Sequence, residues 1–125
     1  MKEITKAQEE ILKALWSINE GAVSDVLEAI HAPKPAYNTV ATVIKVLEKK
    51  EYVWHKTFGK TNVYYPLVTE NEYAKFILKD AAKGFFNNSL NQMVSFFVRN
   101  KDLSIAELEE LKSMIDEEIN KSKIK

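Results

Sequence analysis

Polar and basic side chains recur at helical spacing in the middle of this sequence. Asn38, Thr42, Lys45 and Lys49 follow one another by three or four positions, so they would share one side of an α-helix. Asparagine and threonine can form hydrogen bonds with base edges, and lysine can pair with phosphate. This side of the helix therefore has the chemistry to enter a major groove. The spacing is equally typical of an amphipathic helix whose lysines are only solvated, and the helix alone leaves both interpretations open.

Positive charge is concentrated in the same region, although the net charge of the chain is zero. Residues 31–62 hold six lysines against two acids, Glu48 and Glu51, whereas residues 1–30 hold three lysines against six acids. A basic segment in a neutral chain is typical of a surface that meets a polyanion. The six lysines are Lys34, Lys45, Lys49, Lys50, Lys56 and Lys60.

Residues for catalysis or metal binding do not converge in the sequence. His31 and His55 are the two histidines, and neither has an Asp at ligand-like spacing, so we expect surface or packing roles. The chain has no cysteine, which excludes disulfides and thiolate chemistry, and its three glycines are too scattered for a phosphate-binding loop. We expect no enzyme activity, no cofactor and no metal site. Four aromatic residues are expected to be core rather than ligand pocket: Tyr64, Tyr65, Phe85 and Phe86.

The polar residues need a helix whose other side is buried. Pro35 suits the first turn of a helix, because its missing N–H costs nothing there, so the helix is predicted to begin at Pro35 and to reach Lys50. Apolar residues with helical period predict its buried side: Tyr37, Val40, Ile44 and Leu47, with Val43 at the edge.

Two further helices are predicted before it. Thr5 and Gln8 fit a capping box, which starts a helix near Lys6, and Gly21 is a candidate helix stop. Ser24 can cap a short second helix that ends by residues 31–33. Three helices with short turns before the second and third make a helix-turn-helix candidate.

A β-hairpin is predicted after the third helix. Residues 52–58 and 62–65 are rich in β-forming side chains, and Gly59-Lys60 between them is typical of a turn. Two strands alone are marginal in water, so we expect Trp54 and the tyrosines to lean on the helices. Three helices followed by a hairpin with lysine at its tip predict a winged helix. This second basic element favours DNA binding over the solvated-helix alternative.

The rest of the chain is predicted to be helical. Capping boxes at Thr69–Glu72 and Ser104–Glu107 start two helices, and Gly84 loosens or ends the first. Between them, a second apolar stripe that begins at Leu90 predicts another helix. We therefore expect a mainly α protein with a small β-hairpin, divided into a winged helix-turn-helix DNA-binding domain (1–67) and a three-helix dimerisation domain (68–125).

The apolar side chains of these last helices exceed what so small a domain can bury. A homodimer would cover them through a two-fold axis, and it would give a DNA-binding protein two half-sites. The alternative is that the helices fold back onto the N-terminal domain as a single core. The residues expected at the dimer contact are Phe76, Ile77, Leu90, Met93, Val94, Phe97, Leu108, Leu111 and Ile115.

The N-terminus and the hydropathy predict the compartment. No stretch approaches the ~18 uninterrupted apolar residues of a membrane helix. The charged start MKEITKAQEE lacks the apolar core of a signal peptide. We expect a cytoplasmic protein.

The sequence resembles the penicillinase-repressor (BlaI/MecI type) family of winged-helix transcriptional regulators over nearly its whole length. The resemblance lies in "ILKALW", "AYNTVATVIKVLEKKEYV", "VYYPL" and "FFVRNKDLSIAELEELKSMI". It implies a homodimer that represses transcription from a palindromic operator. It implies these DNA-facing residues: Tyr37, Asn38, Thr39, Thr42 and Lys45, with Lys49, Lys56 and Lys60 nearer the phosphates. The alternative function is a winged-helix protein-interaction module without sequence-specific DNA binding.

The chain departs from the family at several positions. Ala41 and Val46 stand where relatives often carry Arg or Lys, which implies weaker binding or a different operator. The cysteine motif of copper-responsive relatives is missing, which disfavours copper sensing. In some relatives, repression is relieved by a membrane sensor that triggers proteolysis of the repressor at an Asn-Phe bond. The matching bond in this sequence is Phe96-Phe97. We expect Phe97 to be buried, and this pair is interpreted either as dimer core or as a site of proteolytic control.

Overall fold

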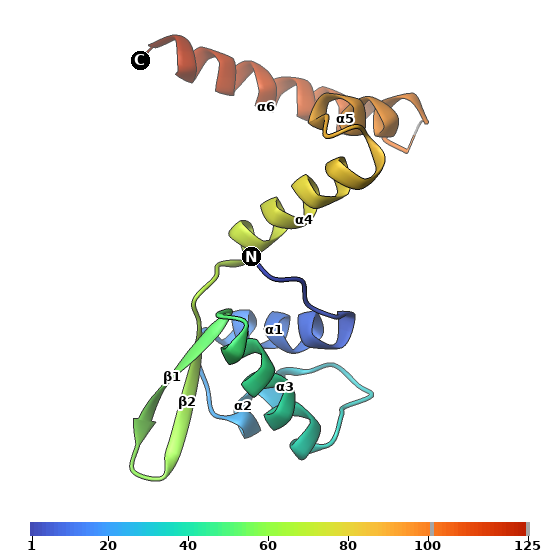
Figure 1. Ribbon diagram of the computed structural model, residues 1–125. Coiled ribbons are helices and arrows are strands. Elements are labelled where there is room, and N and C mark those ends of the chain that lie inside the picture. Colours follow the sequence, from blue (N-terminus) through green and yellow to red (C-terminus); the bar gives the residue numbers. More distant parts are fainter. Residues whose placement is uncertain (101, 125) are drawn as a thin grey trace. The chain divides into compact units, whose positions relative to one another are not determined.

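The computed structural model describes residues 1–100 and 102–124, which divide into two compact units, Met1–Ile77 and Leu78–Lys125. The first unit holds three helices and a hairpin, and α4 passes from the first unit into the second (Figure 1). The elements are α1 (Lys6–Ile18), α2 (Val23–Ala29), α3 (Tyr37–Lys49), β1 (Val53–Phe58), β2 (Thr61–Pro66), α4 (Glu70–Phe85), α5 (Leu90–Arg99) and α6 (Ile105–Ile124).

The predicted fold class is confirmed. β1 and β2 pair antiparallel from Val53↔Pro66 to Phe58↔Thr61, and the turn between them contains Gly59 with φ 62°. Three helices followed by this hairpin form a winged helix. In the described part of the chain, no helix is both long enough and apolar enough to cross a membrane.

α1 begins where its capping box places it, and it ends before Gly21. The Thr5 hydroxyl accepts from the Gln8 N–H (3.2 Å) and the Gln8 side chain accepts from the Thr5 N–H (3.0 Å). Asn19, with φ 70°, ends the helix, so the prediction that Gly21 stops it was wrong. Gly21 instead exchanges two backbone hydrogen bonds with Tyr64 of β2 (3.0 and 2.8 Å). A Cβ at Gly21 would lie 2.8 Å from the Asp25 Cβ, so a larger residue does not fit this contact.

The starts of α2 and α3 differ from the predicted ones. Ala22, not Ser24, is the N-cap of α2, because the Asp25 carboxylate accepts from the Ala22 N–H at 3.0 Å and fixes the first turn there. Ala36 is the N-cap of α3 and the helix begins at Tyr37, so the predicted start at Pro35 was two residues too early. The extended Ala36 backbone (ψ 151°) holds Pro35 outside the helix.

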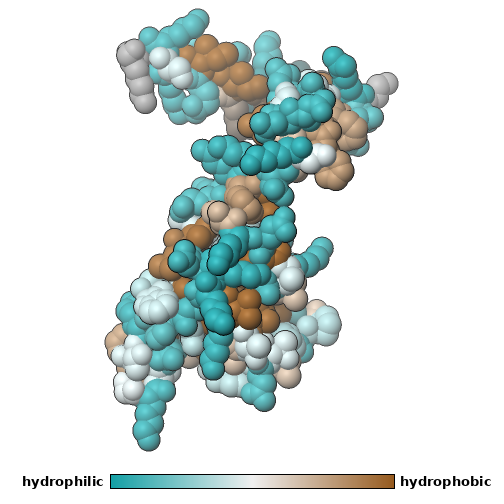
Figure 2. Space-filling model, in the orientation of Figure 1, coloured by the Kyte–Doolittle hydropathy of each residue, from teal (hydrophilic) through white to brown (hydrophobic). Residues whose placement is uncertain are grey.

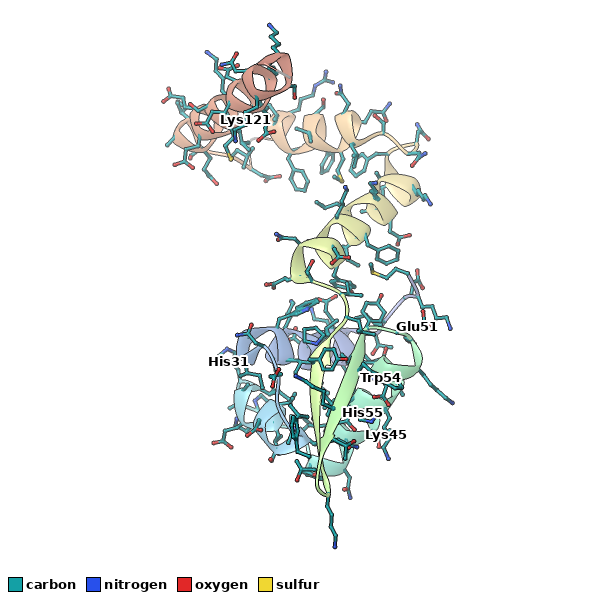
Figure 3. The ribbon with its side chains drawn as sticks, turned by 90° about the vertical axis from the view of Figure 1, so that its left-hand side faces the viewer. His31, Lys45, Glu51, Trp54, His55 and Lys121 are labelled. Atoms are coloured by element: carbon teal, nitrogen blue, oxygen red, sulfur yellow. The ribbon has the colours of Figure 1, made fainter. Side chains whose placement is uncertain are left out.

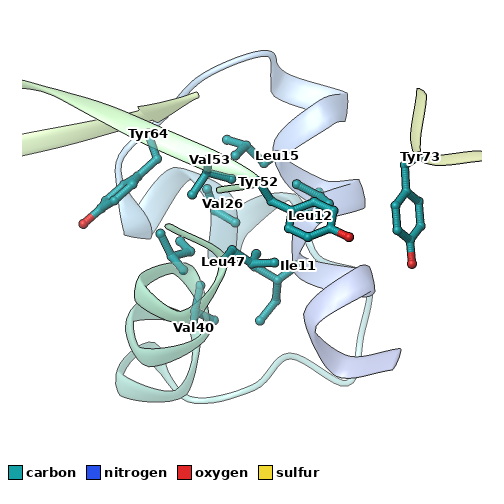
Figure 4. Packing of buried hydrophobic residues seen from close by; sticks show 12 residues of the cluster. Ile11, Leu12, Leu15, Val26, Val40, Leu47, Tyr52, Val53, Tyr64 and Tyr73 are labelled. Carbon is teal, nitrogen blue, oxygen red and sulfur yellow. The ribbon is translucent and has the colours of Figure 1, made fainter. Parts of the chain in front are cut away.

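The core of the first unit lies between α1, α2, α3 and the base of the hairpin (Figure 4). Val40, Ile44 and Leu47 are buried as predicted, but Tyr37 is 52% exposed and does not belong to the buried side of α3. Other fully buried side chains are Leu12, Leu15, Val26, Tyr52 and Val53. Each contributes about 1.5–3 kcal/mol through the burial of apolar surface.

The hairpin packs on the helices through residues other than Trp54. Successive residues of a strand face opposite sides, so burial of Val53 turns Trp54 outward, where it is 50% exposed. The expectation that Trp54 anchors the hairpin was therefore wrong. The tyrosine part of the same expectation is confirmed, because Tyr64 (5% exposed) and Tyr52 (0%) lie in the core with the helices.

The first turns of α4 belong to the first unit. The predicted capping box between Thr69 and Glu72 is present. The Tyr73 hydroxyl donates to the Glu9 carboxylate (2.8 Å), and the Trp16 indole N–H donates to the Val68 carbonyl (2.8 Å). The boundary between the compact units therefore falls within α4, later than residue 67, because these contacts hold the helix to the core. The functional division at residue 67 stays a prediction.

The second unit exposes much apolar surface. α4 ends at Phe85, next to Gly84 as predicted, and the capping box of Ser104 and Glu107 is confirmed. Met93 is buried. Phe85 is 83% exposed, so the assignment of Phe85 to the core was wrong. Figure 2 shows hydrophobic side chains on the surface of the C-terminal helices. The exposed set includes Leu90, Val94, Phe96, Phe97, Val98, Ile105, Met114, Ile115 and Ile119.

Candidate nucleic-acid interface

The outward side of α3 is polar and exposed. It carries no exposed acid. The one carboxylate of the helix, that of Glu48, lies near the C-terminal end of α3 and is only 19% exposed, in contact with His55. The exposed residues of this side are those predicted from the sequence to face a partner: Tyr37, Asn38, Thr39, Thr42, Lys45 and Lys49. Burial of Val40, Ile44 and Leu47 fixes this orientation of the helix.

Thr42 presents a hydrogen-bond acceptor and a methyl group to the outside. Its hydroxyl donates to the Asn38 carbonyl one turn earlier, at 2.9 Å. A hydroxyl has one proton and two lone pairs, so the remaining capacity of Thr42 is to accept. A base edge that offers an amino group, or the methyl group of thymine, fits such a side chain.

Two of the six lysines in residues 31–62 are held by hydrogen bonds within the chain. The Lys34 ammonium donates to the carbonyls of Leu27 (3.1 Å) and Glu28 (2.6 Å) at the end of α2. The Lys50 ammonium donates to the Glu3 carbonyl (2.9 Å) and the Gln8 side chain (3.1 Å). These lysines stabilise the fold, and their part of the local charge excess is not free for a partner.

Lys56 also has a partner that the sequence did not predict. Its ammonium lies 3.3 Å from the Glu20 carboxylate and 5.5 Å from the centroid of the Tyr65 ring. Both charged side chains are about half exposed (52% and 51%), and an exposed pair of this kind contributes at most about 1 kcal/mol. A phosphate can therefore compete with Glu20 for the Lys56 ammonium, and binding of the phosphate would break the Lys56–Glu20 ion pair.

Lys45, Lys49 and Lys60 are the remaining lysines of the segment. None of them has an ion pair or hydrogen bond from its side chain within residues 1–100 and 102–124. Lys60 lies in the turn of the hairpin, beside Phe58, which is 60% exposed. The hairpin extends past the ends of the helices of the first unit (Figure 1). Free positive charge is thus placed on α3 and at the tip of the wing.

Glu48 and His55 form a contact that sequence reasoning missed. The His55 Nδ1 lies 2.5 Å from the Glu48 Oε2, and Trp54 stacks beside the imidazole at 5.0 Å between ring centroids (Figure 3). The two residues are seven positions apart, in different elements. Glu51, with φ 66°, reverses the chain between them. A search for carboxylates on either side of each histidine, Glu as well as Asp, would have found this pair as a candidate.

The residues expected at a dimer contact do not share one environment. Phe76 packs against the core of the first unit and Met93 is buried in the second. Phe97 is 47% exposed, so the expectation of its burial was wrong for the single chain. Leu108 and Leu111 are partly buried. The rest are substantially exposed: Ile77, Leu90, Val94 and Ile115.

Comparison with known proteins places the chain among repressors. The family model described as penicillinase repressor matches residues 4–117. The penicillinase repressor of Bacillus licheniformis is 32% identical over 124 residues, which cover 97% of this chain and 95% of that protein. The methicillin resistance regulatory protein MecI of Staphylococcus aureus (strain N315) is 29% identical over 115 residues, which cover 91% and 94%. The penicillinase repressor of Staphylococcus aureus is 25% identical and covers 92% of each chain.

Proposed function

The chain belongs to the penicillinase repressor family, and we propose that it represses transcription as a homodimer bound to a two-fold-symmetric DNA operator in the cytoplasm. The observation that carries the proposal is the outward side of α3. It is exposed, free of acid and basic at its C-terminal half, while the other side is sealed in the core. A major groove about 12 Å wide admits such a helix.

Each residue of the interface has a proposed role. Tyr37, Asn38 and Thr39 lie in the first turn of α3, and this end of a recognition helix is the one that contacts base edges in helix-turn-helix proteins. Thr42 accepts a hydrogen bond from a base amino group or contacts a thymine methyl. Lys45 lies one turn further along α3, at the edge of the groove, where its ammonium pairs with a phosphate. Lys49 and Lys60 pair with phosphates, and Lys56 joins them once it leaves Glu20.

The proposed dimer contact lies in the C-terminal helices. Leu90, Val94 and Val98 line one side of α5, which is an apolar stripe without cover in the single chain. Exposed apolar patches of this kind mark association surfaces, and a two-fold axis lets one surface cover itself. Two linked DNA-binding units then bind one operator far more tightly than either binds alone.

The other functions considered are less well supported. A protein-interaction module is disfavoured because the family and the relatives reported above are repressors. An enzymatic role has no support from these relatives. Relief of repression by a membrane sensor or a protease that acts near Phe96-Phe97 is a separate proposal. Its support is that both side chains are about half exposed in the single chain (51% and 47%).

Selection from a pool of random duplexes tests the proposed function. We expect recovery of two inverted half-sites about one helical turn, 10–10.5 base pairs, apart. Sedimentation should give one dimer per recovered duplex. Recovery of no preferred sequence, or of a single unrepeated site bound by a monomer, would contradict the proposal.

A further inference from the structure

The hydrogen bond between Glu48 and His55 joins the recognition helix to the wing. Glu48 lies in the last turn of α3, and His55 is the third residue of β1. The two side chains are 19% and 26% exposed, so the contact is partly shielded from water. Within the described ranges, no other side-chain hydrogen bond or ion pair links α3 to the hairpin.

The imidazole of His55 is held in position from two sides. The Trp54 ring is stacked on it at 5.0 Å with 26° between the planes, and the Tyr64 ring lies at 5.5 Å. Tyr64 is itself fixed, because it is 5% exposed and bonded twice to the backbone of Gly21. The nitrogen that faces Glu48 is therefore already oriented in the protein without DNA.

Glu48 is the acid nearest in sequence to the free lysines of α3. It follows Lys45 by three positions, a spacing at which helix side chains meet, and it directly precedes Lys49. A carboxylate released from His55 can pair with Lys45, and its charge repels phosphate on the same side of the helix. In the structure the carboxylate is bonded to His55 instead, and Lys45 has no partner among the described residues.

We propose that His55 is a positioning residue for DNA binding, which holds the Glu48 carboxylate away from Lys45 so that Lys45 is free to pair with DNA. The proposal rests on the proposed function, since it concerns the same interface. The proposed role of His55 is indirect, because its Nδ1 contacts the Glu48 carboxylate and acts on Lys45 only through it. Removal of the imidazole should therefore act through the charge of Glu48.

The test compares five proteins on a random-sequence duplex of about 30 base pairs and on the selected operator, over a series of salt concentrations. His55→Ala should lower the magnitude of the salt slope by up to about 1.8, and lower affinity up to about 60-fold at 0.1 M salt, if each protomer loses one phosphate contact. His55→Gln keeps a donor for Glu48 and should stay near wild type. His31→Ala is the matched control, since His31 is exposed and outside the interface.

Rescue separates this role from a purely structural one. His55→Ala/Glu48→Gln removes the freed charge and should restore both the slope and most of the affinity, although the hydrogen bond is still missing. Thermal unfolding confirms that each variant is folded during binding. A His55→Ala protein that binds like wild type, or a loss that Glu48→Gln does not rescue, would overturn the inference alone. A wild-type protein without salt-dependent duplex binding would overturn the proposed function and the inference with it.

Discussion

Replacement of Lys49 by alanine should change the salt dependence of DNA binding by a calculable amount. Lys45, Lys49 and Lys60 are the lysines of the interface that have no internal partner among the described residues. They give about six phosphate contacts per dimer and a slope near −5.4, before any contribution from Lys56. Lys49→Ala removes two contacts per dimer. The slope should become about 1.8 less steep, and affinity at 0.1 M salt should fall about 60-fold on operator and random duplex alike.

Lys50 supplies a matched control one residue away. Its ammonium is bound to the Glu3 carbonyl and the Gln8 side chain, at 2.9 and 3.1 Å. Lys50→Ala should lower the free energy of unfolding by about 1 kcal/mol and leave the salt slope unchanged. Fluorescence anisotropy titrations from 50 to 200 mM salt measure the slopes, and chemical denaturation measures the stabilities.

The outcome that would refute this reasoning is specific. If Lys50→Ala lowers the slope as much as Lys49→Ala, the internal hydrogen bonds of Lys50 do not withdraw it from the interface. If neither variant changes the slope, α3 does not bring its C-terminal lysines to the phosphates.

Four further predictions follow from the same contacts. Thr42→Ala should reduce discrimination at one base pair by ~1–3 kcal/mol in competition binding, and a uniform loss over all duplexes would remove Thr42 from the base-reading set. A fragment of residues 1–77 should be a folded monomer in sedimentation. A fragment of residues 1–67 should be less stable, since it lacks the core residues Val68, Tyr73 and Phe76. A dimeric 1–77 fragment would place the dimer contact outside the C-terminal helices. The hydrogen bond from the Tyr73 hydroxyl, together with Lys13, lowers the pKa of Glu9. The ionised Glu9 carboxylate therefore stabilises the folded state at pH values above the ordinary pKa of a carboxyl group, and this stabilisation is lost as pH falls through the lowered pKa. Tyr73→Phe should therefore lower the free energy of unfolding by about 1–2 kcal/mol at pH 7 and by less near pH 3, and an equal loss at both pH values would contradict this assignment. After treatment of cells with a cell-wall-active antibiotic, mass mapping should place any cleavage within residues 90–103; a cut elsewhere, or induction with the chain intact, would defeat that proposal.

Most features set by neighbours in sequence were predictable, although the Ala22–Asp25 cap of α2 was missed. The capping boxes of α1, α4 and α6 depend on residues three positions apart, and all three are present. The buried side of α3 follows from the helical period, because Val40, Ile44 and Leu47 lie on the same side of the helix and are all apolar. The same period turned Asn38, Thr42, Lys45 and Lys49 outward. It placed Tyr37 on the buried side, where the structure instead leaves it 52% exposed.

Features set by distant residues were not predictable. Lys50 reaches Glu3 across 47 positions, and Gly21 meets Tyr64 because the hairpin returns to the loop before α2. The face of the hairpin that carries Trp54 depends on the register of β1 with β2, and the β-rich composition did not specify which face packs on the helices. Charge counts along the sequence treated all six lysines alike, whereas packing withdraws Lys34 and Lys50 from the surface available to a partner.

Site-directed disulfide trapping tests most directly whether α3 lies in the major groove. The chain has no cysteine, so Thr42→Cys introduces a unique thiol on the exposed side of α3. Duplexes of the selected operator carry a thiol tether on a cytosine amino group, which projects into the major groove. We predict a cross-link from position 42 at one place in each half-site, and none from Lys112→Cys on α6. Equal cross-linking from position 112, or none from position 42 while binding persists, would contradict the account.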